Sequence, residues 1–302
     1  MDSYNAIPIF VAVAENGSFS GAALKLELSK SAVSKRITIL ESSLQVRLIH
    51  RTTRKLSLTQ AGEQFYQHAK QVMQAARNAE DAVSQLQGEP CGKLKIQAPM
   101  SFGVLHIAPL IAQFLKRYPA IEVDLVLDDK VVDIVENGYD ICIRAGELKD
   151  SSLIVRALAP LQSVICMSED YQQQTPLEQL DDLSAENCIL YSYADEASFW
   201  KFYKHKQQRK VKVTGNYRVN NSEALLCAIK TGVGIGRLPS FVAAKAIKEG
   251  SLVRLFDDYQ MPAKRLFALY PERQYVPLKV RVFIEFAIEF FGNEQPYWDE
   301  FL

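Results

Sequence analysis

The sequence predicts a multidomain chain with a small helical N-terminal domain, one long connecting helix and a larger α/β domain of two lobes. Three features carry this prediction. A cationic helix-turn-helix pattern lies between Ser18 and Arg54, a heptad repeat runs from Phe65 to Leu86, and strand-like and helix-like segments alternate after residue 92. At 302 residues the chain is long enough for two or three domains.

The N-terminal pattern predicts two helices joined by a short turn. Phe19 to Leu26 forms the first helix and Lys30 to Ser43 the second, which Ser29 caps. On the second helix one face is apolar and is expected to be buried, and it comprises Val33, Ile37, Leu40 and Leu44. The opposite face has short hydroxyls and a cation, without an acidic residue, and it comprises Ser31, Ser34, Lys35 and Thr38. Such a face suits the major groove of DNA.

Charge supports the DNA-binding interpretation. From Lys25 to Lys55 there are eight Lys or Arg residues and only Glu27 and Glu41 against them, a net charge of +6. The whole chain has 35 basic and 35 acidic residues and is neutral, so the basic charge is local. The alternative is an amphipathic surface helix with ordinary solvated charges.

A β-hairpin is expected after the second helix. Strand-like residues flank a basic tip from Arg51 to Arg54, and its arginines can enter a minor groove or contact phosphates. The alternative is a solvated hairpin whose charges form salt bridges.

One long helix is predicted from Thr59 to Leu86. Its apolar residues are spaced alternately by four and three positions, which is a heptad repeat. The apolar residues of this repeat form a narrow stripe along the helix, and we expect a partner chain to bury it. The alternative is that the stripe packs on the chain's own second domain. The residues predicted to mediate dimerisation are Phe65, Val72, Ala76, Ala79, Val83 and Leu86, with Ala69 in the same repeat. Pairing would set two recognition helices at a fixed separation.

The remaining chain predicts two α/β lobes with mostly parallel sheets. GKLKIQAP, IEVDLVLDD and DICIRAG are strand-like, and a helix is expected between the first two, from Ser101 to Arg117. A second set of strands and helices follows from about residue 162. A cleft at the strand ends of two such lobes is a usual site for a small ligand.

Several function classes lack support in the sequence. We find no nucleophile elbow, HExxH, P-loop or GxGxxG after a strand, so no catalytic residue, cofactor or metal site is predicted. The five cysteines are dispersed without a CxxC pair, which favours reduced thiols. No apolar run is long enough for a membrane span and no secretory signal is recognised, so a cytoplasmic location is expected.

These features together resemble the LysR-type bacterial transcriptional regulators over essentially the full length. The motifs that carry the resemblance are GSFSGAALKL, SKSAVSK, RTTR, LTQAGEQFY, YPAIEVDLVL, YDICIRAGE and NNSEALLCAIKTGVGIGRLP. One departure is Gln45, which stands where a turn glycine is usual.

The resemblance implies a winged helix-turn-helix domain over residues 1–58, a dimerising linker helix over 59–88 and an effector-binding domain over 89–302. That last domain is expected to have a periplasmic-binding-protein-like (type 2) fold, with lobe 1 at about 92–161 and 265–302 and lobe 2 at about 162–264. The expected partners are double-stranded DNA, a small-molecule effector, and further copies of the chain in a homodimer through the linker helix and a homotetramer.

Site residues follow from the same resemblance. The residues expected at DNA are Ser18, Lys30, Ser31, Ser34, Lys35, Thr38, Arg51, Thr52 and Arg54. The residues expected at the effector are Pro99, Ser101, Phe102, Asp128, Arg144, Tyr193, Asn220 and Ser222. Ser101 and Ser222 could instead be helix caps, and Arg144 could close a structural ion pair.

The function expected is therefore sequence-specific DNA binding controlled by a small effector between the lobes, such as an organic acid or aromatic metabolite. Two alternatives from other classes are an architectural DNA binder without a ligand and an enzyme acting on a small metabolite.

Overall fold

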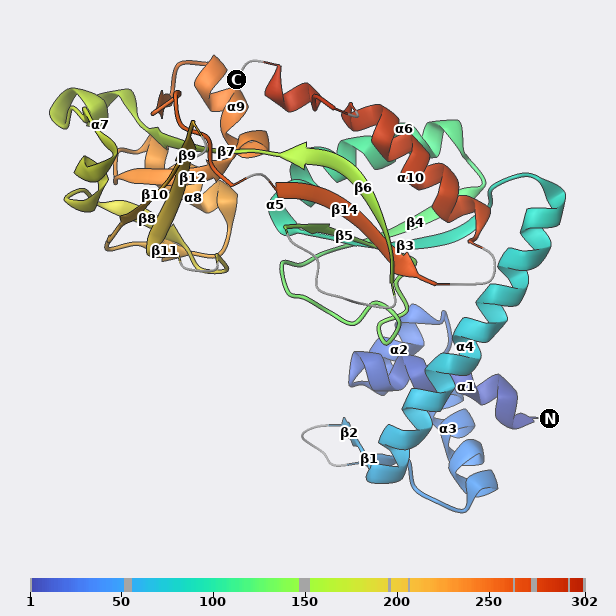
Figure 1. Ribbon diagram of the computed structural model, residues 1–302. Helices are drawn as coiled ribbons and strands as arrows, with labels where there is room; N and C mark the ends of the chain where they lie inside the picture. Colours follow the sequence, from blue (N-terminus) through green and yellow to red (C-terminus); the bar gives the residue numbers. More distant parts are fainter. Residues whose placement is uncertain are drawn as a thin grey trace. The chain divides into compact units, whose positions relative to one another are not determined.

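The computed structural model describes residues 2–51, 56–146, 153–194, 197–205, 207–262, 264–272, 276–292 and 294–300. It divides into two compact units (Figure 1). The first comprises Met1–Glu89 with Val135–Gly138, and the second comprises Pro90–Ile134 with Tyr139–Leu302. None of the helices in the described part of the chain is long and apolar enough to cross a membrane.

The first unit contains the predicted helix-turn-helix, which is confirmed. Its elements are α1 (Asp2–Asn16), α2 (Phe19–Lys25), α3 (Lys30–Leu44), β1 (Ile49–Arg51), β2 (Leu56–Leu58) and α4 (Gln60–Gln87). The Ser18 side chain caps α2 by accepting from the Gly21 N–H, and the Ser29 side chain caps α3 by accepting from the Ala32 N–H. Between the two helices, Glu27 has a φ of 53°, which turns the chain sharply.

The core of this unit forms between α1, α3 and the start of α4. Phe10, Val33 and Ile37 are fully buried, and the Phe65 ring packs edge-on against Phe10 at 5.1 Å between centroids. Leu44 was expected in the buried stripe but is 41% exposed. It is the last residue of α3, and Gln45 then takes the left-handed conformation (φ 54°) that favours glycine.

The turn from α3 into β1 is fixed by the buried carboxylate of Glu41. Its Oε1 accepts hydrogen bonds from the N–H groups of Leu48 (2.9 Å) and Ile49 (3.1 Å), and its Oε2 pairs with Arg47 (2.8 Å). A Cβ at Gly62 would lie 2.0 Å from the Leu48 carbonyl oxygen, so only glycine fits where the first turn of α4 crosses this segment. The acid and the glycine together set the path from the recognition helix to the hairpin.

The second unit contains two five-stranded sheets and a separate hairpin. The first sheet has the order β4-β3-β5-β14-β6, with strands β3 (Gly92–Ala98), β4 (Ile121–Leu127), β5 (Ile141–Ala145), β6 (Leu153–Leu161) and β14 (Lys264–Pro271). The second has the order β11-β8-β12-β7-β13, with strands β7 (Ser163–Met167), β8 (Cys188–Tyr191), β11 (Arg218–Val219), β12 (Ile235–Pro239) and β13 (Val253–Leu255). The hairpin pairs β9 (Phe199–Lys204) with β10 (Gln207–Lys212).

The sheets are mixed, so the expectation of mostly parallel sheets is wrong in detail. In the first sheet β3 pairs in parallel with β4 and β5, whereas β14 pairs antiparallel with β5 and β6. The second sheet repeats this arrangement, with β12 parallel to β8 and antiparallel to β7. β6 carries the chain out of the first lobe and β14 brings it back, and antiparallel neighbours need no crossover helix.

Helices cover both lobes. In lobe 1, α5 (Met100–Phe102), the π-helical segment η1 (Gly103–Ile107) and α6 (Ala108–Arg117) follow one another without a break, and α10 (Leu278–Phe291) contacts α6 and the sheet (Figure 1). In lobe 2, α8 (Ser222–Lys230) and α9 (Ser240–Lys248) pack on the sheet. The smaller helices are α7 (Glu169–Gln174), η2 (Leu180–Ser184) and η3 (Tyr297–Asp299).

His106 joins the two lobes inside an aromatic cluster. Its Nε2 lies 3.2 Å from the Phe241 carbonyl oxygen on α9, and its Nδ1 lies 2.5 Å from the Tyr297 hydroxyl. A carbonyl can only accept, so Nε2 carries the proton and Nδ1 accepts from the tyrosine. Burial lowers the pKa of His106 to about 4, against the smaller raising effect of the Phe241 carbonyl, so the ring is neutral at pH 7.

We expect acid to weaken the effector domain through this histidine. Its pKa is depressed on folding, so its contribution is fully present above about pH 6.5 and is lost as the pH falls towards 4. The loss between pH 7 and pH 5 should be about 2 kcal/mol. The measurement is the difference in unfolding free energy between wild type and His106→Gln at each pH. Both tryptophans, Trp200 and Trp298, lie in this domain, so intrinsic fluorescence reports its unfolding. A pH-independent difference would contradict this role.

Candidate DNA-binding surface and ligand cavity

The outward face of α3 is cationic. Lys30, Ser31, Lys35 and Thr38 are exposed and Ser34 is half-buried. The Thr38 hydroxyl donates to the Ser34 carbonyl at 3.0 Å. Lys30 and Lys35 form no ion pair with any residue that the structure describes. The helix therefore presents two lysines and short hydroxyls on one side.

Burial of Glu41 strengthens the positive character of this surface. Its carboxylate, only 3% exposed, points inwards to Arg47 and the Leu48 and Ile49 N–H groups. Of the two acids counted in the basic segment, only Glu27 is exposed.

Of the other predicted DNA contacts, the structure describes the side chain of Ser18 alone. Ser18 is half-buried as the cap of α2. Arg51 is the last residue of β1, and its side chain is outside the described part of the structure. Thr52 and Arg54 also lie outside the described residues.

The heptad repeat on α4 divides into two parts. Phe65 packs against Phe10, and Ala69 is buried in the same core, so the start of the repeat is covered by its own domain. Val72 is 46% exposed, and Ala76 and Ala79 are also exposed, so the described residues do not cover this section of the repeat. The predicted contacts Val83 and Leu86 have side chains outside the described part.

A cavity of about 700 Å³ lies between the two lobes of the second unit. Residues at the end of β3 and on α5 line it from lobe 1, and residues of β8, α8 and β12 line it from lobe 2. Of the predicted effector-binding residues, the structure brings together Pro99, Ser101, Phe102, Arg144, Tyr193 and Ser222. The volume of this cavity falls in the range of small-molecule sites, about 300–1,000 Å³.

Asp128 and Asn220, which were also expected at the effector, are not among the residues that line this cavity. The Asp128 carboxylate accepts from the Lys130 N–H at 2.9 Å, and its neighbour Asp129 lines the cavity instead. The amide of Asn220 donates to the Tyr193 hydroxyl at 3.2 Å, so it positions a lining residue. Side chains alternate in direction around a strand end, which is why a shift of one residue changes which carboxylate faces the cavity.

The two serines are not helix caps. Pro99 occupies the N-cap position of α5, and the Asn221 side chain caps α8 by accepting from the Glu223 and Ala224 N–H groups. No hydrogen bond of the Ser101 hydroxyl is found among the described residues. The Met100 N–H at the start of α5 donates to the Asp129 carboxylate at 2.9 Å, so that donor is already engaged.

Arg144 is held by neutral acceptors. Its guanidinium donates to the side-chain oxygen of Gln97 and to the carbonyl oxygens of Ile143 (3.1 Å) and Lys130 (3.3 Å). Burial lowers the pKa of Arg144, and the nearby Asp128 and Asp129 partly offset this. Arg144 forms no ion pair with an acidic side chain among the described residues, so the alternative of a structural ion pair is not supported. The positive charge of Arg144 therefore remains available to a ligand in the cavity.

Comparison with known proteins identifies the family. The model described as "LysR substrate binding domain" matches residues 87–292, and the model described as "Bacterial regulatory helix-turn-helix protein, lysR family" matches residues 4–63. The chain belongs to the LysR family of transcriptional regulators. The HTH-type transcriptional regulator PtxR of Pseudomonas aeruginosa is 35% identical over 291 residues, which cover 96% of this chain and 93% of PtxR.

Solved structures agree with this assignment. CrgA, a LysR-type transcriptional regulator from Neisseria meningitidis, is 32% identical, with a TM-score of 0.62 and coverage of 96% of this chain and 99% of CrgA. The virulence activator AphB of Vibrio cholerae is 26% identical, with a TM-score of 0.64 and coverage of 94% and 98%. LysR-type regulators bind DNA and small-molecule effectors, and the relatives are named as regulators rather than enzymes.

Arg237 is one of the cavity residues that the sequence analysis of this LysR-type regulator did not identify. It lies on β12 in the second sheet and faces the cavity. Burial lowers the pKa of Arg237, and no hydrogen bond or ion pair of its side chain is found within the described ranges. The signal was present, because a single cation interrupts the apolar run GVGIGRLP. A buried cation normally has a partner, so this one points to a ligand.

Proposed function

We propose that this LysR-type regulator is controlled by a small organic anion with an apolar or aromatic body, bound in the cavity between the lobes. Arg237 carries the proposal, because a half-buried guanidinium that lines a cavity without an acidic partner is stabilised by an anionic ligand. Arg144 faces the same cavity from the other lobe and supplies a second guanidinium.

The other lining residues suit the body of such a ligand. Phe102, Tyr191, Tyr193 and Phe241 offer aromatic surface for an apolar or aromatic group. Burial raises the pKa of Tyr191 to about 12, so its phenol stays protonated and can donate to an anion. The Ser101 hydroxyl is a further donor. An anion held by both lobes would favour one arrangement of the lobes over others.

A thermal-shift screen tests this proposal. Benzoate, salicylate, succinate and branched aliphatic carboxylates would each be compared with the corresponding neutral amide. We expect at least one carboxylate to raise the melting temperature by mass action while its amide does not. If no organic anion in a broad set produces a shift, the architectural DNA binder without a ligand becomes the better interpretation.

We further propose that α3 enters a major groove with Lys30, Ser31, Ser34, Lys35 and Thr38, and that the β1–β2 hairpin contacts DNA through Arg51, Thr52 and Arg54. The exposed lysines of α3 and the inward-pointing Glu41 support this orientation. The exposed part of the α4 heptad repeat supports a homodimer, in which two recognition helices face one duplex. A homotetramer would bring together two such dimers.

The replacement Lys35→Ala should weaken DNA binding and leave the fold intact. Lys35 is exposed and forms no ion pair with a described residue, so its removal has little effect on stability. The affinity for a duplex selected from a random-sequence pool should fall, and the slope of log K against log salt should decrease by about 1 if Lys35 contacts a phosphate. Gel shifts at several salt concentrations measure both quantities. Lys116→Ala, on α6, is the matched control, and equal affinities for the two variants would remove Lys35 from the surface.

A further inference from the structure

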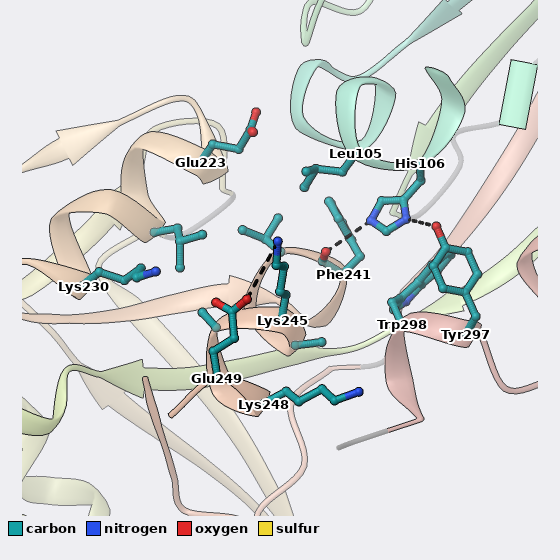
Figure 2. A pocket seen from close by; sticks show the side chains of 14 residues that line it. Leu105, His106, Glu223, Lys230, Phe241, Lys245, Lys248, Glu249, Tyr297 and Trp298 are labelled. Carbon is teal, nitrogen blue, oxygen red and sulfur yellow. Dashed lines mark hydrogen bonds and ion pairs between the residues drawn. The ribbon is translucent and has the colours of Figure 1, made fainter. Parts of the chain in front are cut away.

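A second cavity, of about 550 Å³, lies in the effector domain (Figure 2), and it shares the lining residue Phe241 with the first. It is lined by side chains from η1, α8 and α9 and by Tyr297 and Trp298 of η3. Most of the lining is apolar and includes Leu105, Leu226, Phe241 and Val242. Neither the predicted effector residues nor Arg237 contributes to it.

His106 contributes no free donor or acceptor to the base of this cavity. His106 is neutral, and both of its ring nitrogens are hydrogen-bonded, to the Phe241 carbonyl and the Tyr297 hydroxyl, as Figure 2 shows. Trp298, which also lines the cavity, has a buried Nε1 without a hydrogen-bond partner among the described residues. The rest of the base offers a ligand aromatic and aliphatic surface. Such a surface favours a hydrophobic group over a sugar or a phosphate.

The mouth of the cavity carries more positive than negative charge. Lys230, Lys245 and Lys248 stand there with Glu223 and Glu249. The ion pair between Lys245 and Glu249 is long, at 3.8 Å, and the Lys245 side chain is 86% exposed, so this pairing is weak. Lys230 forms no ion pair with any residue in the described ranges. Lys230 and Lys245 can therefore turn towards an anionic group held at the mouth.

We infer that this cavity is a second ligand site, which takes an amphipathic organic anion. The apolar part of the ligand would lie against Leu226, Phe241 and Trp298, and its carboxylate or sulfonate would meet Lys245 or Lys230. An apolar base with cations only at its mouth matches this chemical class in shape and in charge.

The same geometry links the second site to the first. Phe241 lines both cavities, and its backbone carbonyl is held by His106. On α8, Ser222 lines the first cavity while Glu223 and Leu226 line the second. A ligand that shifts Phe241 or α8 in one cavity therefore changes the walls of the other. This coupling rests on the proposed function of the first cavity, whereas the second site itself does not.

Two fluorescent probes with the same body test the site on the full-length protein. 8-Anilinonaphthalene-1-sulfonate is an amphipathic anion, and N-phenyl-1-naphthylamine is its uncharged counterpart. We expect both to bind the wild type. Leu226→Trp, which fills the cavity, should weaken both probes at least tenfold. Lys245→Gln should weaken only the sulfonate, several-fold, and Lys116→Gln should weaken neither.

Arg237→Gln separates this proposal from that for the first cavity. If Leu226→Trp leaves the affinity of both probes unchanged, the second site is overturned, even where Arg237→Gln reduces binding. If Leu226→Trp removes binding and Arg237→Gln does not, the second site stands whether or not the first cavity takes an anion. A thermal melt checks that Leu226→Trp is folded, and Ala246→Leu, which narrows the same cavity with a smaller side chain, replaces it if it is not. Equal weakening of both probes by Lys245→Gln would contradict the selection for an anion.

Discussion

The Arg237→Gln variant is expected to be more stable than the wild type without ligand and to bind an anionic effector about 10- to 100-fold more weakly. These two effects have opposite signs and a single cause. The guanidinium is buried enough to depress its pKa, and no hydrogen bond or ion pair compensates it within the described residues. Glutamine removes the charge and keeps a side chain that can donate and accept.

The magnitudes follow from the energetics of buried charge. Removing an uncompensated cation should stabilise the unliganded domain by about 1–3 kcal/mol. Charge-assisted hydrogen bonds to a bound anion contribute about 1.5–3 kcal/mol, and their loss accounts for the expected fall in affinity. On this proposal the wild type is less stable because it keeps a cation that is needed only when a ligand is bound, a trade-off that functional sites often show.

Chemical denaturation and calorimetric titration with a carboxylate found in the thermal-shift screen would measure these effects. Arg209→Gln is the matched control, because Arg209 is exposed and paired with Asp181 at 2.7 Å. Arg209→Gln should change neither the unfolding free energy nor the ligand affinity by much. If Arg237→Gln destabilises the protein and leaves the ligand affinity unaltered, Arg237 serves the fold and does not bind the effector.

The features that the sequence predicted well are those that local spacing determines. Ser29 was identified as a cap because a hydroxyl before an apolar-periodic run is a local signal. The buried positions Val33 and Ile37 follow from helical periodicity. Ser101 and Arg144 were placed at the cavity by family resemblance at strand ends, where small ligands commonly bind.

The features that it missed depend on partners distant in sequence or in register. Arg237 was not identified as a site residue, because the sequence shows a single cation in GVGIGRLP but does not show that the folded chain gives this cation no partner. Asp128 was expected at the cavity and Asp129 lines it, because the ends of strands are the least reliably predicted part of an element. The β9–β10 hairpin was missed because the outward-facing Phe199 and Tyr203 are aromatic like the inward-facing Trp200 and Phe202, which obscures the alternation.

The Glu41→Ala variant should unfold the N-terminal domain more easily and bind DNA more weakly, although it removes a negative charge from a basic segment. Alanine leaves the buried N–H groups of Leu48 and Ile49 without the carboxylate that now accepts from both. Each buried donor left without a partner costs about 1–3 kcal/mol, a large share of the total stability of a small domain. The hairpin would also lose its fixed position relative to α3.

The sign of the change in DNA affinity decides between two roles for Glu41. If net charge governed binding, removing an acid would tighten it, most strongly at low salt. Because Glu41 is only 3% exposed and faces inwards, we expect the positional loss to dominate and the affinity to fall. Glu27→Ala is the control, because Glu27 is exposed on the turn before α3, and its removal should leave stability nearly unchanged and tighten binding slightly. Circular dichroism melts and gel shifts would measure both variants, and tighter binding by a fully stable Glu41→Ala would show that this carboxylate does not hold the hairpin in place.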